Sequence, residues 1–229
     1  MTTRLSELVL TRYLYNKALV IESLQKAIDE NVYNDALYWA YEIYYSGFED
    51  ELVEFIMLLF ENRYKHHVKL RSYIQKKYKA NRITKDPTFV ATILKNMNIK
   101  NYKQQETVKP RYIIVKADQI EEFKTLETTN HKWKVLQTMC KKPVTLIKNI
   151  KKTEAAKLLK IFRSKWIYYA SRSPIWKARI LEYHGKIDGR KKTVEFKNDD
   201  DLEGFHDKYD YEPDEQPLNI QKGCMGIPI

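Results

Sequence analysis

Apolar residues recur at intervals of three and four through most of this 229-residue chain, and this spacing predicts helices. Glycine occurs only six times, and 43% of the residues are hydrophobic, which is enough to bury a core. We therefore expect a mainly α fold, a helical bundle. The predicted helices cover residues 5–14, 18–29, 36–45, 50–64, 88–97, 118–126, 132–140, 153–171, 175–183 and 199–209, with a basic amphipathic helix between residues 62 and 85 that ends near Ala80.

Extended structure is predicted at a few places. The run RYIIVK (residues 111–116) predicts a strand, and residues 186–197 predict a β-hairpin with Asp188 and Gly189 in the turn. These elements make the fold α+β at most, with the minor β element in the C-terminal half. Asn34 or Asp35 is expected to cap the helix over 36–45, and Gly47 to end it in a left-handed conformation.

The order of these elements suggests four segments. An N-terminal helical bundle that ends in the basic amphipathic helix is predicted over residues 1–97. A polar linker over 98–109 precedes a basic helical domain with the small β element over 110–209. The residues from 210 to 229 are predicted to form an extended tail, because proline, glycine and polar residues dominate there.

Charge is strongly segregated along the chain. The formal net charge is +11, but residues 62–197 hold 35 basic and only 10 acidic residues, while the segments on both sides are acidic. Such a block produces a positive field that attracts polyanions. A solvated face in a lysine-rich protein is the plainer interpretation, although lysine is not spread evenly here.

The predicted polyanion-binding residues fall in two clusters, around the basic amphipathic helix and near residue 150. Aromatic residues near the basic clusters could stack on bases, as in single-strand binding grooves. The apolar stripe that contains Trp166 argues instead for a place in the core. The binding candidates are Arg63, Lys65, Lys69, Arg71, Lys76, Lys77, Lys79, Arg82, Lys141, Lys142, Lys148, Lys151 and Lys152, and the stacking candidates are Tyr73, Tyr78 and Trp166.

Catalytic and metal motifs are missing from the sequence. The histidines and the two cysteines show no metal-ligand spacing, and no nucleophile or dinucleotide fingerprint occurs. The run Asp199–Asp201 with Glu203 could hold Mg²⁺ beside a phosphate, but carboxylates at a helix start more often cap it. We therefore predict no catalytic residue, no metal and no cofactor, and the minority interpretation is an enzyme with a site built from scattered carboxylates.

Location is constrained by other absences. No apolar run approaches the roughly 20 residues needed to span a bilayer, and residues 1–10 lack the apolar region of a signal peptide. Two cysteines exclude a disulfide framework and fit a reducing compartment. A protein that is not secreted is expected.

Three stretches carry a resemblance: ALYWAYEIYYSGFEDELVEF (36–55), SPIWKARILEYHGKID (173–188) and YDYEPDEQP (209–217). They resemble uncharacterised proteins of giant, nucleocytoplasmic large DNA viruses. The resemblance implies a host cytoplasmic viral factory or the virion as the location and brings no assigned activity. Residues 18–64 also resemble, more weakly, the helical collar domain of clamp-loader subunits.

These observations predict a non-catalytic viral binding protein whose basic central surface engages nucleic acid or an acidic protein partner. The alternative is a virion structural or assembly component that docks on other viral proteins through its aromatic-rich helices. The alternative predicts a large exposed apolar patch on the helices of residues 36–60.

Overall fold

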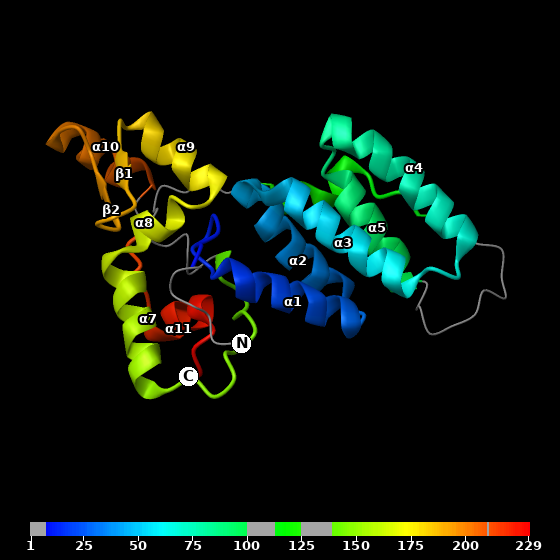
Figure 1. The fold of residues 1–229 in the computed structure, drawn as a ribbon, viewed down its shortest axis with the longest axis horizontal. Helices are drawn as coiled ribbons and strands as arrows, with labels where there is room; N and C mark the ends of the chain where they lie inside the picture. Colours follow the sequence, from blue (N-terminus) through cyan, green and yellow to red (C-terminus); the bar gives the residue numbers. More distant parts are fainter. Residues whose placement is uncertain (1–7, 100–112, 125–138, 210) are drawn as a thin grey trace. The chain divides into compact units, whose positions relative to one another are not determined.

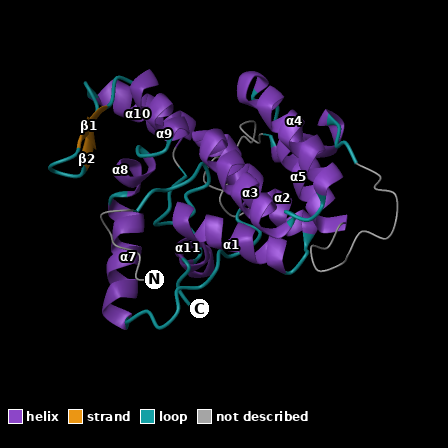
Figure 2. Cartoon of the chain, turned by 45° about the vertical axis from the view of Figure 1, so that its right-hand side comes forward, coloured by secondary structure: helices purple, strands orange, loops and turns teal. Residues whose placement is uncertain are grey.

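The computed structural model describes residues 8–99, 113–124, 139–209 and 211–229, without the side chains of Arg82, Ile83 and Ile99. The chain divides into two compact units. Unit 1 is formed by residues 1–22 and 126–229, and unit 2 by residues 23–125. The fold is mainly α, as predicted, and Figure 2 shows one small sheet among the described residues.

Unit 2 is built from helices that follow one another closely. α5 packs against α2 and α4, and α2 also contacts α3 (Figure 1). Its core contains Trp39, Ile56, Phe60 and Val90, all almost inaccessible to solvent. The elements are α1 (Lys17–Asp29, which crosses the unit boundary), α2 (Tyr33–Ile43), the π-helical turn η2 (Tyr44–Phe48), α3 (Glu49–Arg63), α4 (Val68–Thr84), α5 (Thr88–Ile99) and the 3-10 helix η3 (Ala117–Phe123).

Unit 1 contains shorter helices and the hairpin. α11 packs against α7, α10 against α9, and α8 against β2. The described elements are α7 (Lys152–Ser164), α8 (Trp166–Ala170), α9 (Pro174–Glu182), β1 (Lys186–Asp188), β2 (Thr193–Glu195), α10 (Asp199–Tyr209) and α11 (Leu218–Met225). The predicted hairpin is present, with Ile187 opposite Val194 in an antiparallel pair. Its turn begins one residue later than predicted, because Asp188 pairs with Thr193 at the end of β1.

Residues 8–16 are not helical, which corrects the prediction for 5–14. This segment is buried on all sides, and Leu14 has a φ of 60°. Its backbone groups bond to other segments: the Leu10 N–H donates to the Tyr169 carbonyl (3.2 Å). A helix would have satisfied those groups internally, so tertiary hydrogen bonds override the local spacing here. Residues 5–7 lie outside the described part.

The predicted strand at 111–116 is also wrong where it is described. Residues 113–116 form no strand, and the backbone groups of Ile113 and Val115 bond to side chains of α5. The Val115 N–H donates to Thr92 Oγ1 (3.1 Å), and the Asn96 amide exchanges hydrogen bonds with the Ile113 backbone. Two polar residues on a helix thus replace the neighbouring strand. Residues 111 and 112 lie outside the described part.

Three further differences between prediction and structure concern where helices begin, break or occur. The helix predicted over 153–171 breaks at Lys165 (φ −136°, ψ 17°), which separates α7 from α8. α2 begins at Tyr33, so neither Asn34 nor Asp35 caps it, whereas Gly47 has the expected positive φ of 89°. The tail predicted to be extended contains α11, whose Cys224 and Met225 are fully buried.

Two predicted segments fall mostly on residues that are not described. The helix over 132–140 is described only at residues 139 and 140. The linker over 98–109 begins with the last two residues of α5, and its other residues lie outside the described part.

Candidate nucleic-acid interface

The basic helix α4 is positioned by a tight turn after α3. The Tyr64 N–H donates to the Phe60 carbonyl (2.8 Å) and the His67 N–H to the Tyr64 carbonyl (2.9 Å), so that α4 starts at Val68. Leu70 and Ile74 are fully buried, one helical turn apart. The opposite side of α4 therefore faces solvent.

Three cations of the region 62–85 are held by carboxylates of unit 2. Arg63 pairs with Asp29, and Lys85 pairs with Asp50. Arg71 Nη2 lies 3.0 Å from Glu61 Oε2, and the other oxygen of Glu61 accepts a hydrogen bond from Gln75 (2.8 Å). These three residues serve the folded structure, and their charges are already compensated.

Five lysines of the same region are exposed: Lys65, Lys69, Lys76, Lys77 and Lys79. No carboxylate in the described part of the chain lies within ion-pair distance of them. Lys69 and Lys76 are seven residues apart, two turns on the same side of α4, and lie away from the buried stripe. Lys79 follows one turn later. Arg82 belongs to the last turn of α4, and its side chain lies outside the described part.

The two tyrosine candidates on α4 are half-buried. The Tyr73 ring lies 6.0 Å from Lys77 Nζ, and burial raises the pKa of Tyr73. The Tyr78 ring packs 6.4 Å from Phe89 and borders an open groove of about 660 Å³ between α3 and α4. The groove is also lined by Glu54 and by Leu58, whose exposed fraction is 61%. Lys79 also lines this groove, which is therefore mixed in charge, whereas Lys69 and Lys76 lie outside its lining.

The second predicted cluster lies in unit 1, before and at the start of α7. Lys141, Lys148, Lys151 and Lys152 are exposed, and Lys142 is half-buried with its carbonyl accepting from the Tyr15 hydroxyl (2.9 Å).

α7 adds two exposed lysines that the sequence analysis did not select, Lys157 and Lys160. They lie on the side of the helix opposite the buried Leu158 and Phe162. Lys157 and Lys160 are three residues apart and lie away from the apolar stripe of the helix. This pattern is the signal that could have identified them.

Trp166 is a correction, because it is only 6% exposed and cannot stack on a base. Its ring packs edge-on against Trp176 (5.2 Å between centroids) and alongside Phe205 (6.4 Å). Trp166 therefore belongs to the core of unit 1, as the apolar stripe that contains it indicated. Tyr73 and Tyr78 are therefore the remaining candidates for base stacking.

The aromatic residues of α2 and η2 also pack internally. Tyr41 stacks on Tyr45 and on Phe123, with centroid distances of 5.7 and 5.2 Å. Among residues 36–60, all of which are described, Leu58 is the single large hydrophobic residue that is exposed. The large apolar patch expected for the assembly alternative is not found there.

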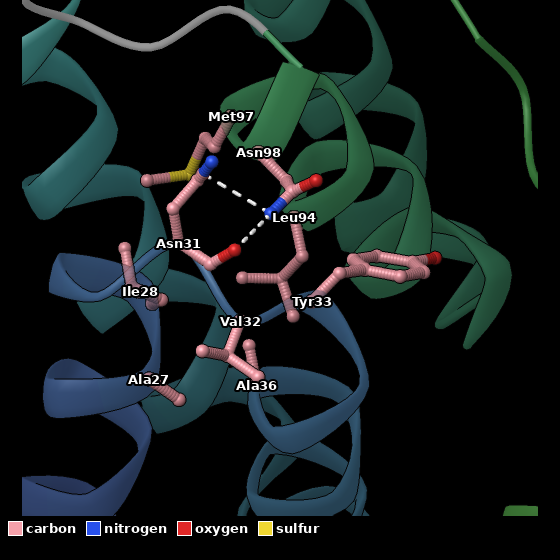
Figure 3. A pocket seen from close by; sticks show the side chains of 9 residues that line it. All are labelled: Ala27, Ile28, Asn31, Val32, Tyr33, Ala36, Leu94, Met97 and Asn98. Atoms are coloured by element: carbon pink, nitrogen blue, oxygen red, sulfur yellow. Dashed lines mark hydrogen bonds between the residues drawn. The ribbon is translucent and has the colours of Figure 1, made fainter.

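A small cavity lies between α1, α2 and α5, as Figure 3 shows. Asn98 Nδ2 closes one side by donating to the carbonyl (2.7 Å) and to Oδ1 (3.1 Å) of Asn31. The remaining space is about 10 Å³, which is the room for one water molecule. Sites for small molecules are typically about 300 Å³ or more, so this cavity is not a ligand site.

The acidic run at the start of α10 is used structurally. The Asp201 N–H donates to Asn198 Oδ1 (2.8 Å), so Asn198 caps the helix, and an Asp201 oxygen lies 3.1 Å from His184 Nδ1. In the described ranges no three histidine, cysteine or acidic side chains are grouped to hold a metal ion.

No family model, curated protein or solved structure matches this chain. Of the helices formed by the described residues, none has the length and apolar character needed to cross a membrane.

Proposed function

We propose that the protein binds nucleic acid, without catalysis, through the exposed lysines of α4. The observation that carries this proposal is the division of cations on and beside this helix. Arg63, Arg71 and Lys85 are matched with carboxylates, whereas the exposed lysines have no carboxylate within ion-pair distance in the described part of the chain. These are Lys65, Lys69, Lys76, Lys77 and Lys79.

Unmatched exposed cations are suited to phosphate. When lysines neutralise phosphates, condensed counterions are released, and this release drives sequence-independent binding. Lys69 and Lys76 are about 10 Å apart along the helix axis, and Lys79 is about 4.5 Å further on. The row is thus a line of point charges along one side of a rigid helix. Lysines before and along α7 in unit 1 are exposed as well, namely Lys141, Lys148, Lys151, Lys152, Lys157 and Lys160.

The resemblance to proteins of giant DNA viruses completes the proposal. It makes viral nucleic acid the target and the cytoplasmic factory or the virion the location. An acidic protein surface is the other partner that the same lysines would attract.

The test is a titration of fluorescent DNA duplexes with the full chain at several salt concentrations. The variant Lys69→Gln/Lys76→Gln/Lys79→Gln removes three charges from α4. If each lysine contacts one phosphate, the slope of log affinity against log salt becomes smaller by about two to three. The change should not depend on the DNA sequence.

A matched control removes the same charge elsewhere. Lys26, Lys191 and Lys208 are each paired with a carboxylate, namely Glu30, Glu195 and Glu182. Their combined replacement by glutamine should leave the salt slope unchanged. A wild-type affinity that does not vary with salt, or an equal loss in the two triple variants, would refute the proposal.

Experiments on the same full chain distinguish the assembly alternative from nucleic-acid binding. The alternative expects stable co-purification with structural proteins of the particle while DNA binding is absent. The aromatic rings of α2 and η2 pack inside unit 2. Within residues 36–60, docking on another protein would therefore use the exposed Leu58 in the groove between α3 and α4.

A further inference from the structure

The two cysteines of the chain meet inside unit 1. They are 84 positions apart in the sequence, yet Cys140 Sγ lies 3.4 Å from Cys224 Sγ. Cys140 lies two positions after the undescribed residues 125–138, and Cys224 lies in α11 near the C-terminus. Neither spacing nor motif relates the two residues, so only the fold brings them together.

Backbone hydrogen bonds hold the chain in place on both sides of this pair. The Val144 N–H donates to the Gly223 carbonyl (3.1 Å) and the Ile147 N–H to the Gly226 carbonyl (2.8 Å). The Cys224 carbonyl itself accepts from the Asn16 N–H (3.0 Å). These hydrogen bonds fix the backbone near both cysteines, and the fixed backbone keeps the two sulfur atoms close together.

The remaining distance to a covalent bond is small. A disulfide has a sulfur–sulfur length of about 2.05 Å, so the two atoms need to approach by only about 1.4 Å. Cys140 is 8% exposed and Cys224 is fully buried, so a small oxidant reaches Cys140 first.

We propose that Cys140 and Cys224 are a redox modification site that closes to an intramolecular disulfide in the presence of a peroxide. The Cys140 thiolate attacks one peroxide oxygen, the O–O bond breaks, and hydroxide leaves, which gives a sulfenic acid on Cys140. The Cys224 thiolate then attacks that sulfur, the S–S bond forms and a second hydroxide leaves. With the two thiol protons the products are one disulfide and two water molecules, so the thiols lose two electrons and the peroxide gains them.

The bond would fasten the C-terminal helix to the body of unit 1. It closes a loop that contains α7, α8, α9, the hairpin and α10, and such a crosslink limits the freedom of the unfolded chain. α11 already contacts α7, where Arg163 Nε donates to Gln221 Oε1 (2.7 Å). Oxidation should therefore stabilise an arrangement that is present in the reduced protein.

The experiment treats the full chain with hydrogen peroxide and then measures its mass under denaturing, non-reducing conditions. The expected product is a monomer lighter by two hydrogen atoms, with a peptide that joins Cys140 to Cys224. Its melting temperature should rise by about 5–10 °C. Dithiothreitol should reverse both changes, which separates them from methionine oxidation, since dithiothreitol does not reduce methionine sulfoxide.

The variants Cys140→Ala and Cys224→Ala provide the control. Neither should show the reversible rise in melting temperature, and Cys140→Ala, which changes the less deeply buried position, keeps the test open if the other variant does not fold. The proposal is overturned if both thiols of the peroxide-treated wild type still react with an alkylating reagent after denaturation. It is also overturned if the oxidised product is a disulfide between two chains.

Discussion

Tyrosine hydroxyl groups tie the helices of unit 2 to the segments around α5. The Tyr41 hydroxyl donates to the Pro87 carbonyl (2.9 Å), and the Tyr44 hydroxyl to the Lys85 carbonyl (2.6 Å), both in the connection between α4 and α5. The Tyr64 hydroxyl donates to the Met97 carbonyl (2.6 Å). Each bond gives a backbone carbonyl near a helix end a hydroxyl donor, and the Pro87 carbonyl also accepts from the Val90 N–H (3.2 Å).

Alkaline pH should weaken unit 2 through these tyrosines. Burial raises the pKa of Tyr33 to about 12, and it raises the pKa of Tyr41 well above its ordinary value of 10. In the unfolded chain Tyr41 loses its proton near pH 10, while in the folded chain it keeps it. The neutral form is thus favoured by folding, and its contribution is complete below pH 10 and is lost as the pH rises toward the folded pKa.

The variant Tyr41→Phe tests this pH dependence. Above pH 10 the wild type should lose about 1.4 kcal/mol of unfolding free energy per pH unit through this residue. Near neutral pH the variant should be less stable by about 1 kcal/mol, because the hydrogen bond from the Tyr41 hydroxyl to the Pro87 carbonyl is lost. Denaturant titrations at increasing pH should therefore show the two stabilities converging, and parallel curves would contradict the assignment.

Trp176 is the residue on which the core of unit 1 depends most. It is fully buried, its Nε1 donates to the Thr11 carbonyl (3.0 Å), and its ring contacts Trp166 and Tyr211. The guanidinium of Arg179 lies 4.7 Å from the centre of the same ring. The indole therefore joins the N-terminal segment to the helices of this unit.

The variant Trp176→Ala should destabilise unit 1 by about 3–5 kcal/mol, because it leaves a large cavity and an unsatisfied carbonyl. Urea titration followed by circular dichroism measures the change. Leu218→Ala is the control, since Leu218 is 49% exposed and its replacement should change stability by less than about 0.5 kcal/mol. Similar losses of unfolding free energy in both variants would show that the stability of unit 1 does not depend on the Trp176 ring.

At the scale of the elements, α11 depends on the residue that ends it. Gly226 has a φ of 66°, and a Cβ placed there would meet Leu19 Cδ1 and lie 2.8 Å from the Thr145 carbonyl oxygen. Its own carbonyl accepts the hydrogen bond from Ile147. A residue with a side chain would have to adopt an unfavourable backbone conformation and also displace the segment packed against it.

Gly226→Ala should therefore cost about 2–4 kcal/mol of stability and loosen α11. Hydrogen exchange of the α11 amides measures the second effect directly. Gly189→Ala in the exposed hairpin turn is the matched control, because a Cβ at Gly189 meets no atom within 4 Å. Unchanged protection of α11 in Gly226→Ala would contradict this account of the helix end.

At the scale of the whole molecule, charge is the property that the fold leaves exposed. The formal net charge is +11, and the lysines on the solvent sides of α4 and α7 keep their positive field directed outward. Trp166, by contrast, is in the core. The proposed nucleic-acid binding should thus depend on phosphate charge more than on bases.

Heparin, a polyanion without bases, should consequently displace DNA from the full chain. Competition titrations at fixed salt should give complete displacement, and duplexes of different sequence should bind with affinities within about threefold of each other. A strong preference for one sequence, or resistance to heparin at moderate salt, would indicate base recognition that this surface does not explain.

The helices were largely predictable because local forces decide them. The apolar residues located α1 and α3, and residues typical of helix starts located α5 and α10. The glycine at position 47 marked the end of the α2–η2 region, since few other residues adopt its φ. Within the candidate interface, Lys69, Lys76 and Lys79 were found for the same reason. A stripe of buried residues on a helix fixes which side faces solvent.

The features that the sequence did not predict depend on contacts between residues far apart in the chain. Residues 8–16 and 113–116 bond to distant groups, and the pairing of Arg63 with Asp29 and of Arg71 with Glu61 separates structural cations from exposed ones.

The sequence by itself determined a mainly helical chain with a basic middle, because helix periodicity and charge are properties of neighbouring residues. Only the tertiary structure decided which cations are neutralised, that Trp166 is buried, and that Cys140 and Cys224 lie together. Each of these depends on contacts between residues far apart in the chain, and no local pattern encodes such contacts.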